Sequence, residues 1–173
     1  MKMKREFILI IFALASFTSV VAQQKLTTFI LIRHAEKASG NSMSDSSKDP
    51  NLSDAGKKRA ESLVTIFKNT SLQAIYSTAF TRTKDTVTPL AKAKGITINN
   101  YEAFKTEVID KILNDFEGGT ILICGHSNNI PWIANYLIGT EKFKTFDDTD
   151  YGNMLVVSVS EKGKVANVTW LNY

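Results

Sequence analysis

Apolar residues come in short blocks along most of the chain, and their spacing predicts alternating strands and helices. Residues 27–32 and 120–124 are apolar on both faces, which is typical of strands buried in the middle of a sheet. Four further strands are predicted at residues 74–77, 96–98, 154–160 and 165–171. The last two flank Glu161-Lys162-Gly163, which is a hairpin turn signal.

Between these strands, apolar residues spaced three and four apart predict helices. Ser53 is a candidate N-cap for the first of them. The predicted helices cover residues 53 to about 69, 81–94, 104–116 and 130–137. Residues 38–51 are polar and predict a long loop. Strands that alternate with helices predict an α/β protein, a three-layer α/β/α sandwich with a mainly parallel central sheet.

Polar residues that could take part in catalysis or ligand binding follow three of the predicted strands. Arg33-His34 ends one strand, Ser77 ends a second and Gly125-His126 ends a third. In parallel sheets, ligands bind outside the carboxyl ends of the strands. We therefore expect these three positions to meet at one edge of the sheet.

The first 22 residues have the pattern of a secretory signal peptide. Lys2, Lys4 and Arg5 precede an apolar run, and Val20-Val21-Ala22 offers small residues for cleavage after Ala22. A membrane anchor is the alternative, but about 15 apolar residues are fewer than the roughly 20 that span a bilayer. We predict a signal peptide over 1–22, a domain over 23–173, and an exported protein, periplasmic or secreted, that does not stay in the membrane.

Composition and charge narrow the function further. Hydrophobic residues make up 43% and charged residues 22%, as in a globular protein. Residues 1–22 contribute +2 of the net charge of +4, so the remaining chain is only weakly basic and a nucleic-acid partner is not expected. Cys124, the single cysteine, lies in an apolar strand, where a buried small hydrophobe is a better interpretation than a nucleophile.

The chain has two histidines, His34 and His126, and each directly follows a strand of the buried type. Either one alone could be structural, but two at the end of the sheet where ligands bind indicate a site. Arg33 requires an anionic partner, either a nearby carboxylate or a phosphate held by its planar fork. Arg82, at the start of a predicted helix, is open between a solvated residue and a second anion ligand.

These residues stand in segments that resemble those of the histidine phosphatase (phosphoglycerate mutase-like) superfamily. The resembling segments are Leu31-Ile32-Arg33-His34-Ala35-Glu36-Lys37, Asn51-Leu52-Ser53-Asp54-Ala55-Gly56, the run from Tyr76 to Thr86, and Ile121-Leu122-Ile123-Cys124-Gly125-His126-Ser127. The first has Ala35 where the family signature has Gly. The segments follow the family order and extend over most of the chain after residue 22.

The resemblance implies a phosphohistidine mechanism. His34 attacks phosphorus through its neutral imidazole, and the intermediate is then hydrolysed. Arg33, Arg82 and His126 hold the phosphoryl oxygens. His126 acts in its protonated form when phosphate is bound, which predicts a falling rate at alkaline pH. No metal or cofactor is expected, and the expected partner is a small phosphorylated substrate; the oligomeric state stays open.

The acid that protonates the leaving group is the open point of this mechanism. Glu102 lies in the region where much of the family carries that Glu, and Glu107 is its rival. Another branch of the family has an Asp after the second histidine, where this chain has Ser127. Some compact members with an Arg-His-Ala-Glu start dispense with the carboxylate and favour leaving groups that need little protonation.

The acidic run Asp147-Asp148-Thr149-Asp150 lacks the spacing of a calcium loop and predicts a solvated turn, and Tyr151-Gly152-Asn153 after it is a candidate pocket rim. The function predicted by the resemblance is a histidine acid-type phosphatase, a hydrolase of phosphomonoesters or phosphoramidates. Two alternatives remain open: a phosphotransferase of the phosphoglycerate mutase type, and an inactive module of the same fold that binds phosphorylated ligands.

Overall fold

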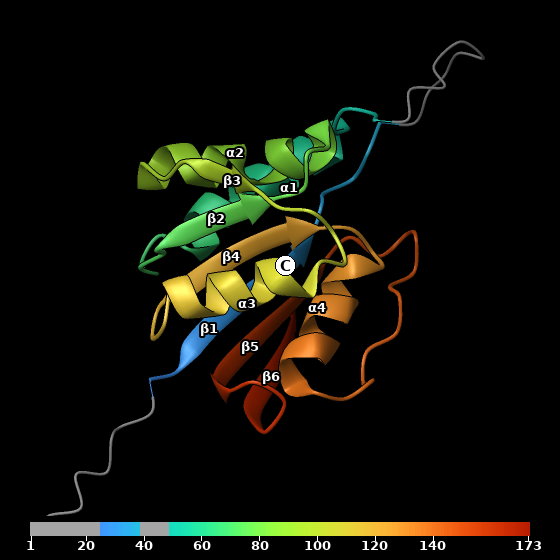
Figure 1. The fold of residues 1–173 in the computed structure, drawn as a ribbon. Coiled ribbons are helices and arrows are strands. Elements are labelled where there is room, and N and C mark those ends of the chain that lie inside the picture. Colours follow the sequence, from blue (N-terminus) through green and yellow to red (C-terminus); the bar gives the residue numbers. More distant parts are fainter. Residues whose placement is uncertain (1–24, 39–48) are drawn as a thin grey trace, which may run out of the picture.

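The structure, a computed structural model, describes residues 25–38 and 49–173. These residues form one six-stranded sheet with helices on both faces (Figure 1). The strands are β1 (Thr27–Arg33), β2 (Ala74–Ser77), β3 (Ile98–Asn100), β4 (Thr120–Gly125), β5 (Asn153–Glu161) and β6 (Val165–Asn172). The helices are α1 (Asp54–Ile66), α2 (Thr81–Lys94), α3 (Thr106–Asp115) and α4 (Asn129–Ile138). The predicted signal peptide and most of the predicted 38–51 loop lie outside the described residues.

The sheet is mainly parallel, as predicted. Its strand order is β3-β2-β4-β1-β5-β6. The first four strands of this order are parallel to one another, while β5 pairs antiparallel with β1 and β6 antiparallel with β5. The two strands that are apolar on both faces, β1 and β4, lie side by side in the middle, where both of their faces are covered. The predicted fold class is confirmed.

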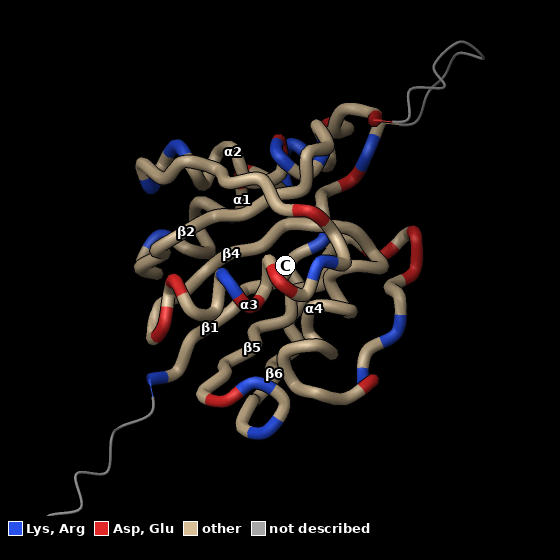
Figure 2. Tube along the Cα trace, in the orientation of Figure 1, with Lys and Arg blue, Asp and Glu red and all other residues tan. Residues whose placement is uncertain are grey.

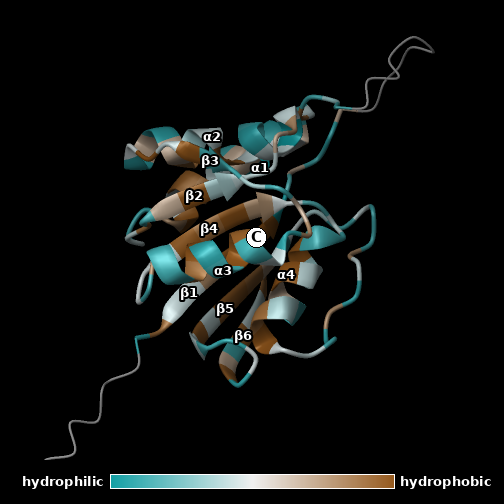
Figure 3. Cartoon of the chain, in the orientation of Figure 1, coloured by the Kyte–Doolittle hydropathy of each residue, from teal (hydrophilic) through white to brown (hydrophobic). Residues whose placement is uncertain are grey.

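Alternate residues of β1 enter two separate cores, which is the direct sign of three layers. Phe29 and Leu31 pack in the core that includes Ile109 of α3 and Ile133 of α4. Ile30 and Ile32 pack in the core under α1 and α2, formed by residues such as Leu63, Val87 and Leu90. Figure 3 shows the same arrangement, with hydrophobic strands between helices that are polar on their outer sides.

Charged residues lie over the helices and loops, and there is little charge along the central strands (Figure 2). Within the described ranges, no helix has both the length and the apolar character needed to cross a membrane.

Several predicted boundaries were wrong by two or three residues, among them the end of the first helix, which was expected near residue 69 and lies at Ile66. Two of these errors have a clear local cause. The third strand starts at Ile98 instead of residue 96, because Gly95 adopts a left-handed conformation and the Ile96 N–H still bonds to Ala91 O of α2. Helix α3 starts at Thr106 instead of residue 104, because Phe104 has a φ of 59°, outside the helical region.

The segment after β1 is fastened to the start of α1. The Ser53 side chain accepts a hydrogen bond from the Gly56 N–H and caps the helix, while the Ser53 N–H donates to Glu36 O at 2.9 Å. A Cβ atom on Gly56 would lie 2.2 Å from Glu36 O. The Leu-Ser-x-x-Gly segment therefore needs glycine at this position for close backbone contact, and this contact fixes the path of the chain leaving β1.

Candidate active site

The three predicted strand ends meet at one edge of the sheet, as expected. Strand β4 lies between β2 and β1, and all three run parallel. A cavity of about 590 Å³ opens at their carboxyl ends, and it is lined by residues that include Arg33, His34, Arg82, Glu102 and His126. The volume is in the range of small-molecule sites.

His34 is buried, with 4% of its surface exposed, and held in one orientation. Its backbone N–H donates to Gly125 O at 2.8 Å, and its ring Nδ1 lies 2.8 Å from Ala35 O. A carbonyl oxygen only accepts, so Nδ1 carries the proton in this contact and Nε2 keeps a free lone pair. Burial, together with the positive charges of Arg82 and Arg33, lowers the pKa of His34 to about 3, against the hydrogen bond to Ala35, which acts in the opposite direction. His34 is therefore neutral throughout the physiological pH range.

Thr86 of α2 supports the His34 segment. Its hydroxyl accepts a hydrogen bond from the Ala35 N–H at 2.9 Å and donates to Arg82 O at 2.7 Å. The side chain is fully buried. Thr86 belongs to a segment recognised in the sequence, but its link between the β1 end and α2 was not predicted.

His126 lies beside His34, with 5.4 Å between the ring centroids. Its Nε2 lies 3.0 Å from Thr78 Oγ1, and its Nδ1 lies 3.4 Å from an Nη atom of Arg82. Arginine only donates, so in this state Nδ1 accepts and Nε2 donates to Thr78. Burial and the charges of Arg82 and Arg33 lower the pKa of His126 to about 4. The ring is neutral at rest, and an anion placed between it and Arg82 would favour its protonated form.

The backbone of His126 is fixed by two buried residues that the sequence analysis did not single out. Asn129 accepts a hydrogen bond from the His126 N–H at 2.6 Å and donates to the Tyr101 hydroxyl at 2.7 Å. A Cβ atom on Gly125 would lie 2.4 Å from Asn129 Oδ1 and 2.6 Å from the Tyr101 oxygen. Gly125, which has no side chain, thus leaves room for these two hydrogen bonds of Asn129. The one sequence feature that could have indicated them is a glycine at the end of a buried strand, shortly before a polar residue at a helix start.

The sequence left two anionic partners open for Arg33, a nearby carboxylate or a bound phosphate. In the structure, backbone carbonyls make most of its contacts. Its guanidinium donates to three backbone carbonyls of the acidic segment, Asp147 at 2.6 Å, Asp150 at 2.9 Å and Asp148 at 3.1 Å. The Asp148 carboxylate lies 3.7 Å away, and the guanidinium stacks at 4.2 Å from the Tyr151 ring centroid. The side chain is 2% exposed, and its Nε has no hydrogen-bond partner among the described residues.

The acidic segment at 147–150 is therefore more than a solvated turn. Its side chains are exposed as predicted, and the Thr149 N–H donates to Asp147 Oδ1 at 2.9 Å within the turn. Its carbonyl oxygens, however, point at Arg33 and hold the guanidinium in place. No residue pattern could indicate this contact, because every residue type supplies the same backbone carbonyl.

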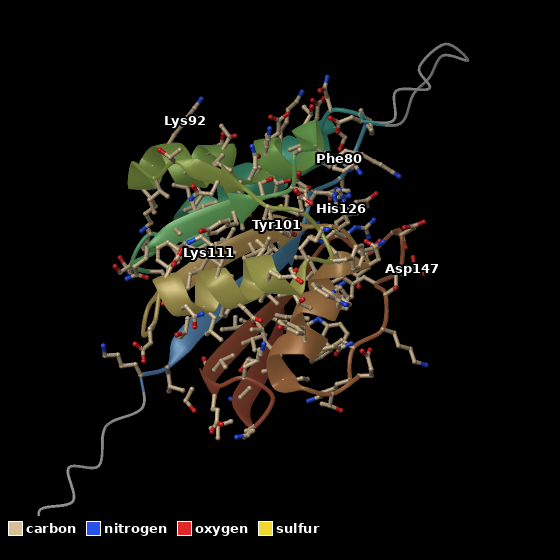
Figure 4. The ribbon with its side chains drawn as sticks, viewed as in Figure 1. Phe80, Lys92, Tyr101, Lys111, His126 and Asp147 are labelled. Carbon is tan, nitrogen blue, oxygen red and sulfur yellow. The ribbon has the colours of Figure 1, made fainter. Side chains whose placement is uncertain are left out.

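Arg82 lies at the start of α2, between an acid and the pocket. It forms an ion pair with Asp49 at 3.2 Å and lies 4.4 Å from the Phe80 ring centroid. The Asp49 carboxylate also accepts from the Thr81 N–H at 2.8 Å, so it occupies the N-terminus of the helix. Burial raises the pKa of Asp49, but the hydrogen bonds from Thr81 and the charge of Arg82 outweigh this and keep it below its usual value. Figure 4 shows Phe80 close to His126 at this edge of the sheet.

The candidate acids occupy different places. Glu102 is exposed and lines the cavity, whereas Glu107 lies in the first turn of α3 and is not among the lining residues. Ser127 also lines the cavity. Cys124 is fully buried, which raises the pKa of its thiol, so the prediction of a small buried hydrophobe is confirmed. Within residues 25–38 and 49–173, no three His, Cys, Asp or Glu side chains are grouped as metal ligands.

Residues 29–106 match the model of the histidine phosphatase superfamily (branch 1). The resemblance inferred from the segments of the sequence is therefore confirmed over these residues, and solved structures of phosphatases share the fold. The His126 segment lies beyond the matched residues and is placed at the site by the structure. No curated protein matches the sequence.

Several solved structures have the same fold at low sequence identity. Mycobacterial glucosyl-3-phosphoglycerate phosphatase has a TM-score of 0.64 at 11% identity, over 85% of this chain and 99% of that one. The protein histidine phosphatase SixA complexed with tungstate has a TM-score of 0.63 at 14% identity, over 84% and 96%. Phosphoserine phosphatase of Entamoeba histolytica in complex with 3-phosphoglyceric acid has a TM-score of 0.62 at 17% identity, over 85% and 97%. The match to the superfamily model, together with these structures, supports a phosphatase function.

Proposed function

We propose that this protein is a phosphatase that hydrolyses phosphomonoesters or phosphoramidates through a phosphohistidine on Nε2 of His34. The observation that supports this most directly is the state of that ring. Its Nδ1 is held by Ala35 O at 2.8 Å, and its pKa is lowered to about 3, so Nε2 is an unprotonated nucleophile at the floor of the cavity. Two arginines and a second histidine lie around it.

In the first step, the Nε2 lone pair of His34 forms a bond to phosphorus, and the bond from phosphorus to the leaving oxygen or nitrogen breaks with its electron pair. The phosphoryl oxygens lie between Arg82 and His126, where the 3.4 Å contact of the resting state is replaced by contacts to the anion. Arg33 offers its Nε–H, which has no partner in the described part of the chain, while the carbonyls of the 147–150 segment keep its guanidinium from turning away. Fixed donors of this kind stabilise developing charge without reorganisation.

In the second step, water attacks phosphorus and the P–N bond breaks. The electron pair returns to Nε2 of His34, a proton of the water is released, and inorganic phosphate leaves. The hydrogen bond from Nδ1 to Ala35 O spreads the positive charge that the ring carries while it is phosphorylated. Thr86 keeps Ala35 in position through both steps.

We assign the role of general acid to Glu102, which lines the cavity; Asp148 lines it as well, but its carboxylate lies 3.7 Å from Arg33. Glu107, the rival of Glu102, does not line the cavity. A leaving group that is already a good one needs no such proton, so the Glu102→Gln variant is expected to slow alkyl phosphates more than aryl phosphates. Equal slowing of both classes would remove Glu102 from this role.

Trapping of the covalent intermediate tests the proposal. Residues 23–173 are mixed with an aryl phosphate and quenched, and a phosphohistidine is detected by its lability in acid and stability in base. The parent protein is expected to show an initial burst, and the His34→Asn variant is expected to show neither burst nor label. Lys92→Ala, on the exposed far end of α2 (Figure 4), is the matched control and should behave as the parent.

The same experiment separates the alternatives. Transfer of the phosphoryl group to an alcohol in preference to water would indicate a phosphotransferase of the mutase type. Binding of the phosphate ester without turnover in the parent would indicate a binding module. Turnover by His34→Asn at the parental rate would rule out a phosphohistidine on His34.

We further propose that residues 1–22 direct export and are removed after Ala22. This rests on the basic start and the apolar run of the sequence alone. N-terminal sequencing of the protein from the periplasm or medium of an expressing cell should begin at Gln23. A protein that begins at Met1 in the cytoplasm would contradict it.

A further inference from the structure

Two phenylalanine rings lie exposed at the rim of the cavity that contains His34. Phe80 is 40% exposed and Phe104 is 50% exposed, and both line the cavity. They come from different segments of the chain, since Phe80 precedes α2 and Phe104 precedes α3. The exposed part of each ring would be covered only by a ligand, so their position at a cavity mouth indicates a binding role.

The Phe104 ring is presented by an unusual backbone conformation. Among the described residues, Phe104 is the one non-glycine residue with a positive φ. Such a conformation costs a bulky residue roughly 1–3 kcal/mol and is concentrated at ligand clamps and active sites. The Trp132 ring contacts Phe104 edge-on at 5.4 Å between centroids, and Tyr136 stacks on Trp132 at 5.7 Å. This aromatic support holds the exposed ring in place.

The Phe80 ring is fixed from the other side. It meets His126 edge-on at 5.0 Å between centroids, and the Arg82 guanidinium lies 4.4 Å from its centroid. The ring thus lies against two of the three residues that are proposed to hold the phosphoryl group. A substrate phosphate bound there would extend its leaving group past Phe80.

The charges at the rim decide what kind of leaving group fits. Lys37 is accompanied there by two acids, Glu102 and Asp148. The two arginines that line the cavity are already engaged, Arg33 by the 147–150 carbonyls and Arg82 by Asp49, and both are proposed to hold the first phosphate. A second phosphate would therefore meet Lys37 and two carboxylates, so polyphosphorylated leaving groups are disfavoured. An uncharged ring meets no such repulsion.

We infer that Phe80 and Phe104 form a subsite for a flat, uncharged ring on the leaving-group side of the phosphate. This inference rests on the proposed function for the position of the phosphate. The substrate class is then an aromatic or heteroaromatic monophosphate, and not a polyphosphate or a simple alkyl phosphate.

Binding of two phosphonates by calorimetry tests the subsite without turnover, because a C–P bond is not hydrolysed. Benzylphosphonate and cyclohexylmethylphosphonate have similar bulk, but only the first carries a flat aromatic ring. Hydrophobic burial alone would favour the more apolar cyclohexyl ring. We expect the protein to bind the benzyl compound about 2- to 12-fold more tightly, the range of an aromatic pair.

Phe80→Leu and Phe104→Leu keep apolar bulk and remove the ring, and each should reduce this preference. Phe143→Leu, whose ring contacts Trp170 outside the cavity, should keep it. Equal affinity for the two phosphonates, a preference for the cyclohexyl compound, or no phosphonate binding would overturn the subsite. A benzyl preference without hydrolysis of benzyl phosphate would leave the subsite standing and refute the phosphatase proposal.

Discussion

Substitution of Asn129 tests how the site is built, because this residue supports His126 and does not itself line the cavity. It is fully buried at the start of α4, accepts from the His126 N–H at 2.6 Å and donates to the Tyr101 hydroxyl at 2.7 Å. The Asn129→Leu substitution keeps the approximate size and removes both hydrogen bonds. It leaves a buried N–H and a buried hydroxyl without these partners.

The expected loss of stability follows from those two groups. Each stranded buried group costs about 1–3 kcal/mol, which is a large share of the roughly 5–15 kcal/mol that holds a domain folded. The effect on catalysis is separate. Without its backbone anchor, the His126 ring moves relative to Arg82 and Thr78, and a displacement of about 1 Å at a reacting group costs on the order of 100-fold in rate.

Asn135 is the matched control on the same helix. It is 5% exposed and makes four hydrogen bonds, donating to Glu141 and Phe143 O and accepting from the Lys142 and Phe143 N–H groups, toward the end of α4 away from the site. Asn135→Leu should therefore lower stability by at least as much as Asn129→Leu. The acidic segment keeps a separate anchor, the hydrogen bond from the Phe146 N–H to Ser127 O, so the rate should stay near that of the parent.

The assay combines urea unfolding with kcat/KM for an aryl phosphate, measured where both variants are fully folded. We expect both variants to lose stability and only Asn129→Leu to lose activity. If Asn129→Leu kept the parental kcat/KM, or if Asn135→Leu lost as much activity as Asn129→Leu, the positioning role of Asn129 would be wrong.

Three further predictions concern pH, the anion site and the fold. The folded-state pKa values of His34 and His126, about 3 and about 4, lie below the unfolded value near 6.5, so unfolding binds protons and the free energy of unfolding falls as pH drops from 6.5 toward 4. Each histidine changes the free energy of unfolding by up to about 1.4 kcal/mol per pH unit. Urea titrations at several pH values should therefore show a shallower pH dependence of this free energy for His34→Asn than for the parent, and equal slopes would contradict the buried neutral ring. Asp49→Asn keeps an acceptor for Thr81 and removes a charge 3.2 Å from Arg82, so the inhibition constant of inorganic phosphate should fall about 2- to 5-fold, and a rise would refute this. Gly56→Ala should lower the melting temperature despite the better helix propensity of alanine, because its Cβ would meet Glu36 O at 2.2 Å; an unchanged or higher melting temperature would show that this contact relaxes freely.

The sequence by itself determined the fold class and the location of the site. Two strands that are apolar on both faces identified the centre of the sheet, since only the interior of a covered sheet tolerates such a pattern. The residues that follow those strands, Arg33-His34 and His126, had to lie together because parallel strands end at the same edge. Periodicity and strand ends are local properties, and they can be seen in the sequence.

The tertiary structure alone decided what surrounds those residues. It placed the carbonyls of the 147–150 segment on Arg33, Asp49 on Arg82, and Asn129 behind His126. These partners lie from 3 to more than 100 residues away in the chain, and several contribute backbone atoms that any residue type would supply. The lowered pKa of His34 has the same origin, because it depends first on burial, which exists only when the sheet and its helices have closed around the ring.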